Sequence, residues 1–159
     1  MKPEYGKVIV GFPGVGKSAL AYNNDFVIDL ESSLFNGVNG ERVDGWEVPY
    51  CNVARWLCRC GFIVCVSSHD NVRAELARKP ADEQILVYPS LKLKEEWIAK
   101  LKSRYYFTKS EKDKRAFSYI EEHYNEAVTG MIYEQGFTHV VINDMDYYLA
   151  EMLNIDNWK

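Results

Sequence analysis

Eight residues near the start of the chain restrict its fold more than any other segment. The sequence GFPGVGKS occupies residues 11–18 and matches the pattern G-x-x-x-x-G-K-[ST]. A short apolar run precedes it at residues 6–10, and the residues that follow it favour a helix. The chain is therefore predicted to begin with a strand, a glycine-rich loop and a helix, in that order.

Each part of this loop has a physical purpose. Glycines let the backbone curl so that consecutive N–H groups point inward, and they leave no Cβ in the way of an anion. The following helix presents its positive N-terminal end to the same anion. Lys17 can reach the β- and γ-phosphates of a nucleoside triphosphate, and the Ser18 hydroxyl can ligate Mg²⁺. The residues expected to bind the triphosphate are Gly11, Pro13, Gly14, Val15, Gly16, Lys17, Ser18 and Ala19.

The rest of the chain alternates between two kinds of segment. Apolar runs recur at residues 26–29, 62–66, 85–88 and 139–142. They are continuous, as expected for parallel strands covered by helices on both faces. Apolar residues at helical spacing fill residues 48–60, 70–79, 93–106 and 112–135. This alternation predicts a single α/β domain over residues 1–159, with three α/β/α layers and a five-stranded, mainly parallel sheet.

Composition limits the compartment and the partners. The net charge of −4 argues against a protein that coats nucleic acid nonspecifically, although residues 92–115 form a local basic stretch. No apolar run approaches the ~18 residues that cross a bilayer, and the N-terminus lacks a signal pattern. We expect a cytoplasmic protein without a membrane partner, as a monomer or homodimer. Its four cysteines are expected to be reduced, namely Cys51, Cys58, Cys60 and Cys65.

Two stretches stand out from the alternation. Residues 32–47 are rich in glycine and asparagine and are predicted to form a mobile loop, and long loops in compact domains are often functional. Residues 104–115 begin and end with arginine and contain Lys109, Lys112 and Lys114. Just before this stretch, Lys92, Lys94, Lys100 and Lys102 alternate with acidic residues on a predicted helix, and their ordinary interpretation is a solvated helix face.

The order of these parts resembles that of the P-loop nucleoside and nucleotide monophosphate kinases, and among them small kinase-like proteins encoded by bacteriophages. The resemblance covers nearly the whole chain, but beyond the phosphate loop it rests on layout. It implies a P-loop NTPase fold in which residues 32–47 bind the acceptor and residues 104–115 form a small lid. Asp29 would face the acceptor or Mg²⁺, while Arg104 and Arg115 would stabilise charge on the migrating phosphoryl group. With Lys17, these are the expected catalytic residues.

The sequence also departs from that family. Ser67 and Ser68 follow the third strand where a Walker B aspartate would stand, so Mg²⁺ would depend on Ser18, helped through water by Asp29 or Glu31. His69 is expected to be a hydrogen-bonded residue rather than a base. For Arg73, an acceptor contact and an ion pair with Asp70 or Glu75 stay open.

Residues 143–146 follow the fifth strand, where the family places the adenine. They lack the lysine of the guanine-binding Asn-Lys-x-Asp string, which favours ATP. Asp144 or Asp146 is an alternative cap for the last helix.

Two classes of function follow from these observations. The first is an ATP- and Mg²⁺-dependent phosphotransferase acting on a nucleotide, a nucleoside or a modified base, with a base within DNA as a less favoured acceptor. The second is a P-loop ATPase or switch module acting on a protein or nucleic-acid partner. The missing Walker B aspartate and the lid-like basic stretch favour the first.

Overall fold

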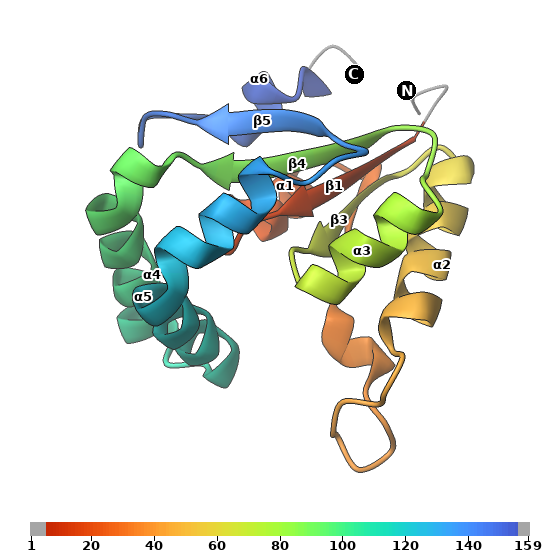
Figure 1. The fold of residues 1–159 in the computed structure, drawn as a ribbon, viewed down its shortest axis with the longest axis horizontal. Helices are drawn as coiled ribbons and strands as arrows, with labels where there is room; N and C mark the ends of the chain where they lie inside the picture. Colours follow the sequence, from red (N-terminus) through yellow and green to blue (C-terminus); the bar gives the residue numbers. More distant parts are fainter. Residues whose placement is uncertain (1–5, 156–159) are drawn as a thin grey trace.

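The computed structural model describes residues 6–155, which form one twisted parallel sheet with helices around it (Figure 1). The strands are β1 (Lys7–Gly11), β2 (Val27–Asp29), β3 (Ile63–Ser67), β4 (Gln84–Pro89) and β5 (Thr138–Ile142). Their order is β2-β3-β1-β4-β5, and every neighbouring pair is parallel. The predicted five strands are thus confirmed, each within one residue of its expected ends.

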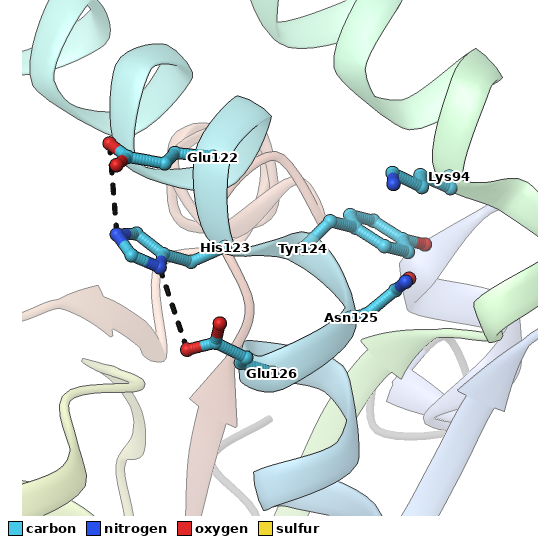
Figure 2. A pocket seen from close by; sticks show the side chains of 6 residues that line it. All are labelled: Lys94, Glu122, His123, Tyr124, Asn125 and Glu126. Carbon is cyan, nitrogen blue, oxygen red and sulfur yellow. Dashed lines mark ion pairs between the residues drawn. The ribbon is translucent and has the colours of Figure 1, made fainter.

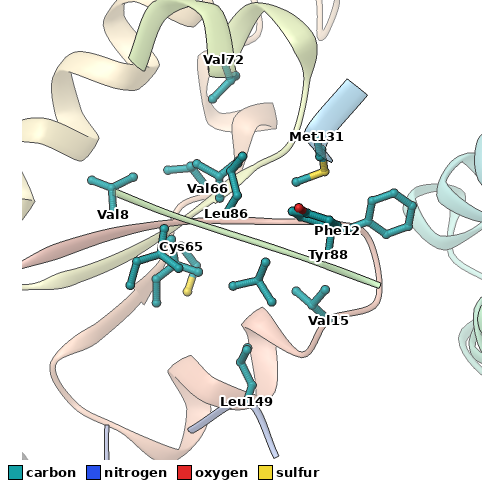
Figure 3. Packing of buried hydrophobic residues seen from close by; sticks show 14 of the residues in the cluster. Val8, Phe12, Val15, Cys65, Val66, Val72, Leu86, Tyr88, Met131 and Leu149 are labelled. Carbon is teal, nitrogen blue, oxygen red and sulfur yellow. The ribbon is translucent and has the colours of Figure 1, made fainter. Parts of the chain in front are cut away.

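The helices fill the connections that the sequence predicts. They are α1 (Lys17–Asn23), α2 (Glu47–Arg59), α3 (Asp70–Arg78), α4 (Lys94–Thr108), α5 (Glu111–Ile132) and α6 (Leu149–Met152), with short 3-10 helices η1 (Ser32–Phe35) and η2 (Leu91–Leu93). Val72 of α3 and Met131 of α5 lie on one side of the strands, and Leu149 of α6 lies on the other (Figure 3). This arrangement is an α/β fold compatible with the predicted three layers.

The strands supply the centre of the core. Val8, Ile9, Val64, Cys65 and Leu86 are completely buried, because helices cover both faces of the sheet. All four cysteines are free, as predicted. Within residues 6–155, no helix combines the length and apolar character that a bilayer span requires.

The predicted lid, residues 104–115, lies where two helices meet. It comprises the last turn of α4, a tight turn, and the first turn of α5, in which the Ser110 hydroxyl caps α5 by accepting a hydrogen bond from the Asp113 N–H at 3.1 Å. Burial opposes ionisation of Asp113, but hydrogen bonds from Thr108 and Ser110 and the charge of Arg104 hold its pKa below the ordinary value. These contacts join α4 and α5 into what we call the α4–α5 hairpin.

The predicted acceptor loop, residues 32–47, contains η1 and is held together by Arg42. The Arg42 guanidinium donates to the Ser32 carbonyl at 2.9 Å and to Asn36 Oδ1 at 3.1 Å, and it lies 4.2 Å from the centre of the Trp46 ring. In Figure 1 this loop and the α4–α5 hairpin project in the same direction, on opposite sides of the end of β1.

Candidate phosphate-binding site

The glycine-rich loop connects the carboxyl end of β1 to the start of α1. β1 is the central strand, with β3 and β2 on one side and β4 and β5 on the other. The chain therefore changes direction across the sheet at β1, and ligands of open α/β sheets bind at the carboxyl ends of strands at such a switch point. The predicted loop thus lies where this architecture places a ligand.

The glycines of the loop meet two local demands. Gly14 has φ 90° and Gly16 has φ 108°, a region that a Cβ disfavours. A Cβ on Gly14 would also lie 2.9 Å from Leu101 Cδ2 and 3.3 Å from Trp97 Nε1 of α4. The curl of the loop and the close approach of α4 therefore both require glycine at position 14.

Two aromatic side chains hold the loop from outside. Trp97 is completely buried, and its Nε1 donates to the Pro13 carbonyl at 2.8 Å. The Tyr147 hydroxyl donates to the Val15 carbonyl at 3.0 Å, and burial raises its pKa to about 12, which keeps it a donor. With these carbonyls bonded outward, the Gly14 N–H makes no hydrogen bond to other residues in the described part of the chain. The loop thus keeps a donor for an anion.

Sequence reasoning missed the role of both aromatic residues. Trp97 was expected only on the apolar face of a helix, and Tyr147 carried no signal. Their rings stack with centroids 6.1 Å apart, so α4 and the segment before α6 close around the loop together.

Lys17 folds over the loop that it terminates. Its Nζ donates to the Gly11 carbonyl at 2.7 Å. Burial is the main cause that lowers its pKa, the Asp29 carboxylate opposes the shift, and the Lys112 charge adds to it. An ammonium group that is partly desolvated in this way is favourably placed to pair with a phosphate.

Ser18 and Asp29 meet next to Lys17. The Ser18 hydroxyl donates to Asp29 Oδ2 at 2.8 Å, which joins the start of α1 to the end of β2. Mg²⁺ prefers oxygen ligands and usually takes one or two carboxylates together with substrate phosphates and waters. A hydroxyl and a carboxylate at this distance fit that ion. No cluster of three or more His, Cys, Asp or Glu residues suited to a metal occurs among residues 6–155.

The cation that the hairpin brings to this site is Lys112. Its Nζ lies 2.6 Å from Glu31 Oε1, which ties the first turn of α5 to the segment after β2. Its charge is also among the causes that lower the pKa of Lys17. Arg104 instead pairs with Asp113, with Nε 2.9 Å from Oδ1. Within the described chain, exposed Arg115 makes no ion pair; the roles of both arginines stay predictions.

His69 lies near the 32–47 loop. Its Nδ1 is 2.8 Å from Ser67 Oγ, and its ring meets the edge of Trp46 with centroids 5.4 Å apart. Desolvation lowers its pKa, and the charges of Arg42 and Lys17 lower it further. His69 is therefore a hydrogen-bonded histidine, as the sequence analysis favours, and its surroundings oppose the charged form.

The structure bears on two further expectations, one about Arg73 and one about the start of the last helix. Arg73 is buried and donates to the Gly130 carbonyl at 3.2 Å while pairing with Asp70 and Glu134, so the expected ion pair with Asp70 is confirmed, and the acceptor contact stays a prediction. The idea that Asp144 or Asp146 caps the last helix is also wrong, because α6 begins at Leu149 without a side-chain cap.

A separate hollow of about 140 Å³ lies where α5 departs from helical geometry at His123 (Figure 2). His123 stands between Glu122, at 3.8 Å, and Glu126, at 3.5 Å. Two carboxylates at this place disfavour a phosphate by like-charge repulsion. The phosphate loop is therefore the stronger candidate site.

Comparison with known proteins adds little to this geometry. No protein-family model matches the sequence, and no curated protein matches it. The solved structure of an uncharacterized protein from Eubacterium ventriosum ATCC 27560 is similar over 98% of this chain and 97% of that chain, at 12% identity and a TM-score of 0.47. This likeness assigns no function.

Proposed function

We propose that this chain is an ATP- and Mg²⁺-dependent phosphotransferase with a P-loop NTPase fold, acting on a nucleotide, a nucleoside or a modified base. The observation that carries the proposal is the meeting of Lys17, Ser18 and Asp29 at the glycine-rich loop that leaves the central strand. A Mg²⁺-bound triphosphate needs backbone N–H donors, a nearby cation and oxygen ligands for the ion. The loop, Lys17, and Ser18 with Asp29 offer these three features.

Each residue has a distinct role in this proposal. The loop N–H groups and Lys17 hold the β- and γ-phosphates, and Ser18 and Asp29 hold the ion directly or through water. When bound, Mg²⁺ supplies charge neutralisation on the phosphate oxygens. An acceptor oxygen, either a hydroxyl or the phosphate oxygen of a nucleotide, attacks the γ-phosphorus while the bond to the bridging oxygen of the leaving diphosphate breaks, and a hydroxyl acceptor releases its proton to solvent.

Lys112 completes this site from the opposite side. Its charge acts on Lys17, and among residues 6–155 its ion-pair partner is Glu31. A γ-phosphate competes with Glu31 for that charge and draws the α4–α5 hairpin over the site. Closure of such an element excludes water, which would otherwise accept the phosphoryl group. This arrangement favours a transferase over a switch module.

The test is Mg²⁺-ATP turnover against a panel of nucleosides, nucleoside monophosphates and short DNAs, with Lys17→Ala as the blank. We expect one acceptor class to raise ADP formation far above the acceptor-free rate and to gain a phosphate itself. ATP binding without phosphorylation of any panel member would instead support the switch module and direct the search to macromolecular partners.

A further inference from the structure

The turn of the α4–α5 hairpin exposes two aromatic rings. Tyr106 is 60% exposed and Phe107 is 91% exposed, both in the last turn of α4. Two adjacent rings in water at one helix end need an explanation, since burial of such rings is favourable by a few kcal/mol. Lys102 Nζ lies over the Tyr106 ring, 5.6 Å from its centre.

The segment around this turn is rich in positive charge. Residues 100–115 contain seven Lys or Arg and two Asp or Glu, a net charge of +5, within a chain whose total is −4. The remaining residues therefore carry −9, from twelve basic and twenty-one acidic side chains. A polyanion is attracted to this turn and repelled by the rest of the surface.

Some of these Lys and Arg side chains have a charged or polar partner in the described part of the chain, and others form no ion pair there. Lys100, Arg104 and Lys112 have partners in Tyr147, Asp113 and Glu31. Four others are exposed and form no ion pair with other residues of the 6–155 segment, namely Lys102, Lys109, Lys114 and Arg115. Together with Tyr106 and Phe107, these four residues are called the tip cluster below.

We propose that the tip cluster is a docking surface for single-stranded nucleic acid. Exposed rings on which bases stack, surrounded by cations that contact the backbone, are the combination that binds single strands without sequence preference. A double helix offers no free base faces to these rings. An anionic membrane would use the cations equally well but gains little from two rings on so short a surface.

The position of the tip cluster adds a functional consequence. Lys112 lies in the same turn of α5 as Lys114 and Arg115 of the cluster and pairs with Glu31, which follows β2. A strand docked on the tip cluster therefore has a nucleotide beside the site proposed for phosphoryl transfer. This placement rests on the proposed function, whereas the docking itself does not.

The experiment measures fluorescence anisotropy of a labelled oligo(dT) of about 12 nucleotides, within the range that one binding domain covers. The full chain is titrated without nucleotide, so the result is independent of ATP. We compare Tyr106→Ala/Phe107→Ala and Lys102→Gln/Lys109→Gln with matched controls elsewhere on the surface. The controls are Tyr22→Ala and Tyr133→Ala, whose rings are 91% and 78% exposed, and Lys79→Gln.

We expect the aromatic double variant to raise Kd about tenfold or more, since each stacked base is worth about 1–3 kcal/mol. The lysine double variant should lower the slope of log K against log salt by about 1.4, because each phosphate contact on a single strand contributes about 0.7. The controls should bind as the wild type does, and a duplex of equal length should bind more weakly.

Equal binding by wild type and both double variants would overturn the proposal. So would binding to vesicles of phosphatidylcholine and phosphatidylserine without binding to the oligonucleotide. Oligonucleotide binding with no ATP binding would contradict the proposed function alone, and ATP turnover with no oligonucleotide binding would contradict the docking surface alone.

Discussion

Replacing Lys112 by methionine separates a catalytic role from a structural one. The ion pair of Lys112 with Glu31 is short at 2.6 Å, but the two side chains are 56% and 41% exposed. Exposed pairs contribute about 0.2–1 kcal/mol to stability because water and salt screen them. Lys112→Met should therefore lower the free energy of unfolding by less than about 1 kcal/mol and the Tm by only about 2–4 °C.

The effect on turnover should be far larger. If Lys112 stabilises charge on the migrating phosphoryl group, its loss resembles the removal of one preorganised donor, which costs about 10²–10³ in kcat. That corresponds to about 2.7–4 kcal/mol, several times the stability effect of the ion pair. We expect kcat to fall about 100-fold while KM for ATP changes little, because the loop and Lys17 still bind the triphosphate.

The assay is steady-state phosphoryl transfer to the acceptor found in the panel, with thermal unfolding of each variant measured in parallel. Glu31→Gln breaks the same ion pair and reports its stability contribution without removing the lysine. Lys92→Met removes an exposed lysine of η2 and serves as the charge control. The reasoning is refuted if Lys112→Met lowers kcat no more than Lys92→Met does.

Three further changes test the phosphate loop itself. Gly14→Ala should destabilise the protein by about 2 kcal/mol or more, because a left-handed conformation costs about 1–2 kcal/mol and the new methyl crowds α4. Gly40→Ala is the control, since Gly40 also has a positive φ but has open space around it, and it should cost less in the same denaturant titration. Trp97→Phe keeps an aromatic ring but leaves the Pro13 carbonyl without its donor, so the free energy of unfolding should fall by about 1–3 kcal/mol. Calorimetry should also show weaker ATP binding, and an unchanged affinity would contradict the role of Trp97 in holding the loop. Because the pKa of Lys17 is lowered, its ammonium loses its proton at a lower pH than an ordinary lysine does, and ATP affinity should fall as alkaline pH rises through that pKa. ATP binding should take up protons in that range because phosphate raises the pKa again, and an affinity independent of pH there would contradict the role of Lys17.

Much of the fold follows from local patterns in the sequence. The continuous apolar runs identify the strands because a parallel sheet buries both of its faces. The glycine-rich loop is equally local, since the positive φ angles of Gly14 and Gly16 are demands of the backbone itself. The contact between Ser18 and Asp29 follows once the carboxyl ends of β1 and β2 lie at one edge of the sheet.

The rest depends on contacts between distant segments. Residues 104–115 were expected to form a lid because of the layout, and that role stays a prediction. The cap at Ser110 and the buried Asp113, which give this segment the shape of a helical hairpin, were not expected. That geometry, not the local sequence, decides that Lys112 approaches the phosphate loop. The hydrogen bonds from Trp97 and Tyr147 to the loop likewise join residues that are far apart in the chain, and no local sequence motif predicts them.

The central claim, that a triphosphate binds on residues 11–18, is tested most directly by amide chemical shifts of ¹⁵N-labelled protein titrated with Mg²⁺ and a non-hydrolysable ATP analogue. We predict the largest shifts at Gly14, Gly16, Lys17 and Ser18, and their loss in Lys17→Ala. Shifts that are absent from the loop, or that gather at the hollow around His123 instead, would contradict the account.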